Sequence, residues 1–99
     1  MLIYCAHQYG GDEKNKRSAE RTIKMLQLKD PNNTYISPIH TFGYMYKDIP
    51  YDRGMELCLS LLSKCNALLV IGEESKGVKL EIEFAKRNGI PMLFTKGVK

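Results

Sequence analysis

The residue whose type and position most clearly suggest chemistry is Glu81. In the helix predicted around it, Val78, Ile82 and Ala85 fall on one side of a wheel drawn at about 100° per residue. Glu81 lies inside this apolar arc, and a carboxylate on a buried face needs a partner or a task. Burial would raise the pKa of the Glu81 carboxyl group. The carboxylate could accept hydrogen bonds from ribose hydroxyls, or it could attack an anomeric carbon. The alternative is a structural carboxylate at a subunit contact or bonded to a backbone amide.

The turn before this helix is a candidate for binding a phosphate or a ribose oxygen. Residues 72–77 follow an apolar segment, and the free backbone N–H groups, the Ser75 hydroxyl and the nearby Gly77 suit such a ligand. The glycine spacing matches neither a dinucleotide fingerprint nor a P-loop. A simple N-cap at Ser75 is therefore the alternative.

Two further segments could contact the same ligand. The first is Ala6, His7, Tyr9, Gly10 and Gly11, where the glycines permit close approach and the tyrosine offers a stacking face; its alternative is a tight turn with an exposed tyrosine. The second is Ser37, His40 and Phe42, in an aromatic segment that could stack a base or pack against another subunit. No spacing of His or Cys indicates a metal site, and no cofactor is predicted.

Alternating elements would position these residues. Strands are predicted at 2–6, 34–37, 67–71 and 90–94, and helices at about 14–28, 52–64 and 75–88. The segment 38–51 is predicted as a long loop, and the last strand as buried. This order indicates an α/β fold: a small Rossmann-like or flavodoxin-like parallel sheet of about four strands with flanking helices. Ligands of such sheets bind beyond the carboxyl ends of the strands, where the strand order reverses.

Composition limits the classes of function. The 99 residues predict a single domain, 1–99, with a small core that favours a homo-oligomer. The net charge is +4, and the cationic residues are scattered along the chain, which argues against nucleic-acid binding. No apolar run is long enough for a membrane span. The three cysteines, Cys5, Cys58 and Cys65, lack a metal-ligand spacing. They are predicted to be reduced, small, buried side chains of a cytoplasmic protein.

The chain resembles the nucleoside 2-deoxyribosyltransferase-like superfamily. The motifs that carry the likeness are residues 3–9, 65–71 and 75–85, and the resemblance extends over nearly the whole chain. It implies that Glu81 corresponds to the family's catalytic nucleophile and Tyr9 to its loop aromatic. Asn66 stands where the family commonly has Asp, and the loss of this acid argues against proton delivery to a departing base.

A closer resemblance is to the short, phage-associated branch of this superfamily, which includes Thoeris anti-defence proteins of the second type. It is carried by residues 37–40, by Cys58 with Leu61 and Leu62, and by residues 74–77. It implies a homotetramer in the host cytoplasm that sequesters a cyclic ADP-ribose signal, such as glycocyclic ADP-ribose, without cleaving it. The alternatives are a nucleoside 2-deoxyribosyltransferase or nucleotide N-glycosidase with Glu81 as nucleophile, and a nucleotide-sensing or structural interaction module.

Overall fold

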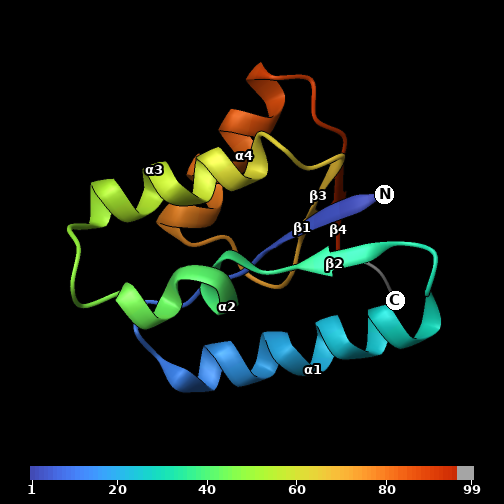
Figure 1. Ribbon diagram of the computed structural model, residues 1–99, viewed down its shortest axis with the longest axis horizontal. Helices are drawn as coiled ribbons and strands as arrows, with labels where there is room; N and C mark the ends of the chain where they lie inside the picture. The colour runs from blue at the N-terminus through green and yellow to red at the C-terminus, as the bar shows by residue number, and fades with distance from the viewer. Residues whose placement is uncertain (96–99) are drawn as a thin grey trace.

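The computed structural model describes residues 1–95, along which strands and helices alternate (Figure 1). The strands are β1 (Leu2–Ala6), β2 (Thr34–Ile36), β3 (Ala67–Val70) and β4 (Met92–Phe94). The helices are α1 (Glu13–Lys29), α2 (Pro38–Phe42), α3 (Tyr51–Leu62) and α4 (Lys76–Arg87), with a 3-10 helix, η1 (Gly43–Met45), after α2. The predicted strands and the three predicted helices are confirmed, with ends that differ by at most a few residues.

The four strands form one parallel sheet in the order β2-β1-β3-β4. Tyr4 of β1 lies beside Leu68 of β3, and Leu69 of β3 beside Leu93 of β4. This topology confirms the predicted Rossmann-like α/β fold. The strand order reverses between β1 and β3, so the crevice expected for a ligand opens beyond Ala6 and Val70.

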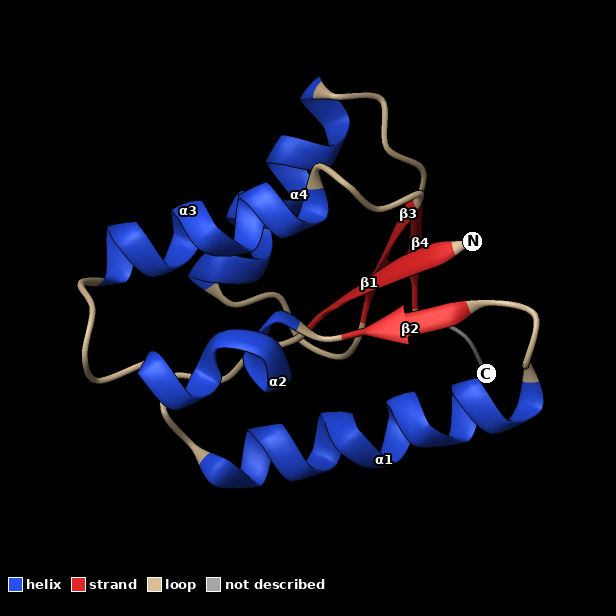
Figure 2. Cartoon of the chain, viewed as in Figure 1, coloured by secondary structure: helices blue, strands red, loops and turns tan. Residues whose placement is uncertain are grey.

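Side chains that alternate along the strands build a core on each face of the sheet. On one face Tyr4 and Leu68 pack with Leu62 of α3 and Val78 of α4. On the other face Ile3, Cys5 and Leu69 pack with Ile23 and Leu26 of α1. Figure 2 shows the resulting layers, with α1 on one side of the sheet and α3 and α4 on the other. All three cysteines are free thiols. Cys5 and Cys65 are buried, as predicted, whereas Cys58 is only half-buried, contrary to the prediction.

The segment 38–51 is not the loop that was predicted, because α2 and η1 occupy its first half. Ser37 caps α2 by accepting a hydrogen bond from the backbone N–H of His40. Pro38 occupies the first helical position, where its missing N–H costs nothing. The proline that ends β2 therefore also begins a helix.

The prediction of a buried last strand is also wrong. Leu93 is 59% exposed and Phe94 39% exposed. The reason is the position of β4 at the edge of the sheet, where β3 is its only neighbouring strand among residues 1–95. An apolar sequence alone does not distinguish an edge strand from a central one.

Within residues 1–95, no helix combines the length and apolar character needed to cross a bilayer.

Candidate functional site

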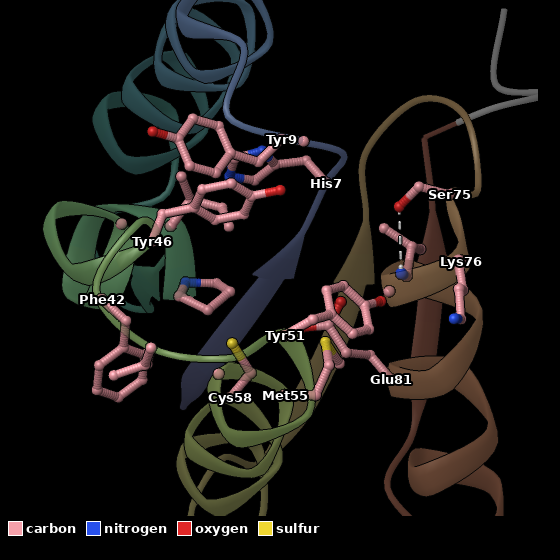
Figure 3. Close-up of a pocket in the computed structure, with 18 of the residues that line it drawn as sticks. His7, Tyr9, Phe42, Tyr46, Tyr51, Met55, Cys58, Ser75, Lys76 and Glu81 are labelled. Atoms are coloured by element: carbon pink, nitrogen blue, oxygen red, sulfur yellow. Dashed lines mark hydrogen bonds between the residues drawn. The ribbon is translucent and has the colours of Figure 1, made fainter.

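A cavity of about 590 Å³ opens at the carboxyl ends of β1 and β3 (Figure 3). The walls come from the loop after β1, from α2 and the chain that follows it, from α3 as far as Cys58, and from α4 as far as Glu81. Seven of the predicted ligand-binding residues line it: His7, Tyr9, Gly10, Phe42, Ser75, Gly77 and Glu81. The cavity therefore lies where the topology of the sheet predicts a ligand.

Four predicted residues do not line this cavity. Ala6 is fully buried within the sheet, and Ser37 is buried between two histidines. His40 points from α2 toward Glu20 on α1. Gly11 is exposed with a positive φ of 78°, and a Cβ there would lie 3.1 Å from Cε1 of Tyr46. Gly11 thus leaves room for a cavity-lining ring without lining the cavity itself.

Sequence reasoning missed much of the wall. The additional lining residues are Pro38, Ile39, Gly43, Tyr46, Ile49, Pro50, Tyr51, Gly54, Met55, Cys58, Lys76 and Val78. Met55 and Cys58 belong to an apolar stripe at helical spacing in the predicted helix 52–64, and such a stripe is typical of a helix that packs on the core. That stripe does pack inward, but its first two turns face the cavity. The aromatic residues of segment 38–51 were the one signal that this region contributes to a site.

Glu81 lies at the base of the cavity and is only 4% exposed. The hydroxyl of Tyr4, itself fully buried, donates a hydrogen bond to Oε2 of Glu81. The other carboxylate oxygen of Glu81, Oε1, makes no hydrogen bond. Among residues 1–95, every side-chain oxygen that is fully shielded from solvent has a hydrogen-bond partner, so Oε1 is not fully shielded. Because Glu81 lines the cavity, Oε1 is available to a ligand there.

Burial raises the pKa of Glu81 from 4.5 to about 7, while the hydrogen bond from Tyr4 acts in the opposite direction. Burial, followed by the charge of Glu81, raises the pKa of Tyr4 well above its ordinary value of 10.0. The tyrosine therefore remains a hydrogen-bond donor, whereas the carboxyl group changes charge near neutral pH. The predicted carboxylate within the apolar face of α4 is confirmed, and its partner is a tyrosine of β1.

The amino-terminal end of α4 forms a second part of the wall (Figure 3). The Ser75 hydroxyl accepts a hydrogen bond from the backbone N–H of Val78 at 3.3 Å, so this residue is an N-cap. Nζ of Lys76 lies 5.2 Å from the centre of the Tyr51 ring. A Cβ at Gly77 would lie 3.3 Å from the Tyr51 hydroxyl, so this glycine lets α3 approach α4 closely. Lys76 is the only Lys or Arg among the described residues that line the cavity.

An aromatic pair forms the opposite wall. The rings of Tyr9 and Tyr46 are 5.0 Å apart and meet edge to face at 74°. The Tyr9 hydroxyl donates to Oε2 of Glu13 at 3.1 Å, which fixes the direction of the side chain. Figure 3 shows this pair across the cavity from the residues of α4. The cavity thus has an aromatic side and a polar side.

Asn66 lies at the other end of the sheet. Its Oδ1 accepts a hydrogen bond from the backbone N–H of Leu2 at 2.7 Å, at the amino-terminal ends of β1 and β3. The cavity opens at the carboxyl ends. The inference that an acid lost at this position removes proton delivery is therefore wrong, because the position is structural.

Within residues 1–95, no three His, Cys, Asp or Glu side chains gather in a way that could hold a metal ion.

Comparison with known proteins identifies the family of the chain without giving it an activity. No curated protein matches the sequence. One family model, described as a domain of unknown function (DUF7768), matches residues 1–95. The match covers almost the whole chain, and the protein therefore belongs to the DUF7768 family.

Proposed function

We propose that the protein binds a nucleotide of the cyclic ADP-ribose class in this cavity and holds it intact. The observation that carries the proposal is that Glu81 is the only carboxylate among the described residues that line the cavity. One buried carboxylate with an accessible oxygen suits the recognition of ribose hydroxyls, because ionised acceptors form the stronger hydrogen bonds.

The remaining wall suits the other parts of such a ligand. Tyr9, Tyr46 and Phe42 offer aromatic surface for a base. Lys76 and the first turn of α4 offer a cation and a positive helix end for phosphate oxygens. The volume of about 590 Å³ falls within the range of about 300–1,000 Å³ that is typical of small-molecule sites.

The ligand stays intact because the cavity holds one acid. Cleavage of an N-glycosidic bond requires a group that attacks or stabilises the anomeric carbon and a second group that protonates the departing base. Glu81 can perform only one of these roles at a time. His7 also lines the cavity, but its Nδ1 lies 3.2 Å from the carbonyl oxygen of Gln8 and its Nε2 lies 2.8 Å from Oγ of Ser37. Neither ring nitrogen is therefore free to protonate a departing base.

By sequestering the signal, the protein would keep it from its effector. The resemblance to the phage-associated branch supports glycocyclic ADP-ribose as the ligand and Thoeris defence as the system that is blocked. It also supports a homotetramer that acts in the cytoplasm of the host. The exposed side chains of Leu93 and Phe94 on β4 support self-association.

A second candidate function is nucleotide N-glycosidase or deoxyribosyltransferase activity, with Glu81 as the nucleophile. Oε1 of Glu81 is the observation that favours it, since the oxygen is accessible while Tyr4 holds the carboxyl group in place. A carboxylate in this position could attack an anomeric carbon that is bound above it.

One experiment separates the two functions. Equimolar protein and purified glycocyclic ADP-ribose are mixed and filtered, and the filtrate and the ligand released by heating are analysed by liquid chromatography. A depleted filtrate with intact ligand after heating supports sequestration. A free base or an opened ring identifies an enzyme, and an unchanged filtrate excludes this ligand.

A further inference from the structure

A continuous chain of side-chain hydrogen bonds connects the cavity with the surface of α1. Oγ of Ser37 lies 2.8 Å from Nε2 of His7 and 3.0 Å from Nδ1 of His40. Nε2 of His40 lies 2.8 Å from Oε2 of Glu20. His7 lines the cavity, and the Glu20 side chain is 48% exposed. Ser37 is 6% exposed, so it joins the two imidazoles where water does not reach.

The acceptors at the two ends fix where the protons lie. Nδ1 of His7 is 3.2 Å from the carbonyl oxygen of Gln8, so this nitrogen carries a proton. The other nitrogen of neutral His7 then accepts, and Ser37 must donate to it. Ser37 in turn accepts from Nδ1 of His40, while Nε2 of His40 donates to the Glu20 carboxylate. This assignment satisfies every bond when His40 is a cation and His7 is neutral.

We propose that Glu20, His40, Ser37 and His7 form a proton relay, and that an anionic group bound beside His7 moves the positive charge from His40 to His7. The relay itself is a property of the free protein. Its use in binding an anion rests on the proposed function, to which it adds a positive charge on His7. Both ring nitrogens of His7 keep their bonds to Gln8 and Ser37, so the attraction to a phosphate is purely electrostatic.

The transfer is balanced and needs no other reactant. The proton on Nδ1 of His40 passes to Oγ of Ser37, and the Ser37 hydroxyl proton passes to Nε2 of His7. Ser37 then donates to His40 and accepts from His7, Nε2 of His40 still donates to Glu20, and Nδ1 of His7 still donates to Gln8. The second arrangement therefore also satisfies every hydrogen bond, and only the position of the charge differs.

The charges around the relay favour His40 as the resting position. Burial lowers the pKa of His7, the hydrogen bond to Gln8 acts in the opposite direction, and the nearby His40 lowers it further. On α1, the hydrogen bond from His40 lowers the pKa of Glu20, with smaller contributions from Lys16 and Lys24. From α4, Lys76 and Glu81 are the charged residues that share the cavity with His7. An anion in the cavity would reverse this preference.

The relay can be tested in the unliganded protein by observing the imidazole nitrogens by ¹⁵N NMR during a pH titration. When the relay carries one positive charge, the hydrogen-bond geometry predicts that Nδ1 and Nε2 of His40 both hold protons and that His7 holds only the one on Nδ1. Both imidazoles cannot donate to the single bridging hydroxyl while it donates to one of them. We therefore expect two well-separated titration steps that appear in the signals of both residues. A neutral His7 with its proton on Nε2 would overturn the relay.

Two substitutions test the connection. Ser37→Ala should abolish the shared steps, so that each imidazole titrates alone, and Ser37→Thr should restore them because it keeps the hydroxyl and the N-cap. Glu20→Gln lies on the surface and should not affect folding. It removes the carboxylate that favours a cationic His40, so the shared proton should be lost at a lower pH, and the His7 signal should report it. If the titration curve of the His7 signals were the same in Ser37→Ala, in Glu20→Gln and in the wild type, the relay would be overturned.

The role in binding is tested with ADP-ribose as the probe. Calorimetry in buffers of different ionisation enthalpy measures the protons taken up, and NMR reads the charge of His7 in the complex. A cationic His7 in the complex, lost in Ser37→Ala and retained in Ser37→Thr, is the expected result. Binding with a neutral His7 would overturn the proposed transfer of charge to His7. Failure of ADP-ribose to bind would count against the proposed function as well, whereas the titrations of the free protein judge the relay independently.

Discussion

At the scale of single residues, the pair of Glu81 and Tyr4 determines how the cavity responds to pH. The carboxyl group is buried, and the tyrosine holds one of its oxygens while the other remains accessible. A pKa of about 7 means that the group is half charged at neutral pH. Stability and ligand binding should therefore change in opposite directions as the pH rises.

Glu81→Gln should make the protein more stable above neutral pH. The native state keeps a proton on Glu81 between 4.5 and about 7, where the unfolded chain has lost it. The free energy of unfolding therefore falls as the pH rises through this window, by about 3 kcal/mol in total. Glutamine removes this dependence. Urea unfolding at several pH values measures it, with Glu83→Gln, an exposed glutamate of the same helix, as the control. Identical profiles for Glu81→Gln and the wild type would contradict the assignment.

Tyr4→Phe should raise the pKa of Glu81 further, because the hydrogen bond from Tyr4 lowers it. Less of the carboxylate is then charged at neutral pH, and the pH at which a nucleotide binds half-maximally should rise. The ¹³C signal of the Glu81 carboxyl group reports the pKa directly. Tyr35→Phe is the matched control, since that hydroxyl donates to Asp30 on the other side of the sheet. A pKa that falls in Tyr4→Phe would refute this role.

The wheel of α4 was sufficient to predict that Glu81 is buried, because the helix has a regular apolar face. It could not identify Tyr4 as the partner, since that contact joins residues 77 positions apart and depends on the pairing of β1 with β3. The hydrogen bonds between Ser37 and the two histidines were hidden for the same reason.

At the scale of elements, the packing of α3 against α4 sets the width of the cavity. Gly77 lies where the two helices meet, with Tyr51 and Met55 of α3 on the other side. Sequence patterns predicted both helices, but the distance between them depends on side-chain volumes that a wheel does not include. A glycine in a helix was consequently interpreted as part of a phosphate-binding turn, although it also provides space.

Gly77→Ala should weaken ligand binding more than it lowers the free energy of unfolding. A Cβ there would lie 3.3 Å from the Tyr51 hydroxyl and 3.5 Å from Sδ of Met55, so the wall must move. Replacing glycine by alanine also reduces the conformational entropy of the unfolded chain, which is worth about 0.4–1 kcal/mol and offsets the crowding. Thermal unfolding and calorimetric binding separate the two effects. Gly54→Ala is the control, because its Cβ would meet Ile49 at an ordinary 3.8 Å. Equal binding by both variants would contradict this role of Gly77.

The element that sequence patterns missed is α2. Its five residues are too few for a periodic pattern, and an aromatic segment after a proline is typical of a loop. The cap at Ser37 was the available signal, since a serine followed by proline is a common helix start. α2 places Pro38, Ile39 and Phe42 in the cavity wall and His40 next to Glu20.

At the scale of the whole molecule, the sheet has one apolar edge. In the described part of the chain β4 has a single neighbouring strand, and Leu93 and Phe94 are exposed. Exposed apolar edge strands pair with other chains unless they are covered. The parallel direction of the strands followed from the alternation of elements, but the strand order was not predicted. The exposure of β4 was not predicted either, because burial depends on position in the sheet and not on the residues of the strand.

Leu93→Lys should shift the protein toward smaller assemblies. A charged side chain at a buried edge contact is costly, whereas Leu93 is already 59% exposed in the monomer, so folding should be unaffected. Analytical ultracentrifugation at several concentrations measures the change. Leu80→Lys, at an exposed position of α4, is the control and should leave the assembly unchanged. A wild-type protein that sediments as a monomer at every concentration would rule out the proposed oligomer.

The central claim is that Glu81 binds the ribose of an intact nucleotide in the cavity. The most direct measurement is calorimetric titration of glycocyclic ADP-ribose into the wild type, Glu81→Gln and Glu83→Gln, with the recovered ligand analysed by chromatography. Loss of a charged acceptor should weaken binding by about 10- to 100-fold in Glu81→Gln. Glu83→Gln should match the wild type, and the ligand should be recovered unchanged from all three proteins. Equal affinity of Glu81→Gln and the wild type, or a cleaved ligand that only the wild type produces, would contradict the account.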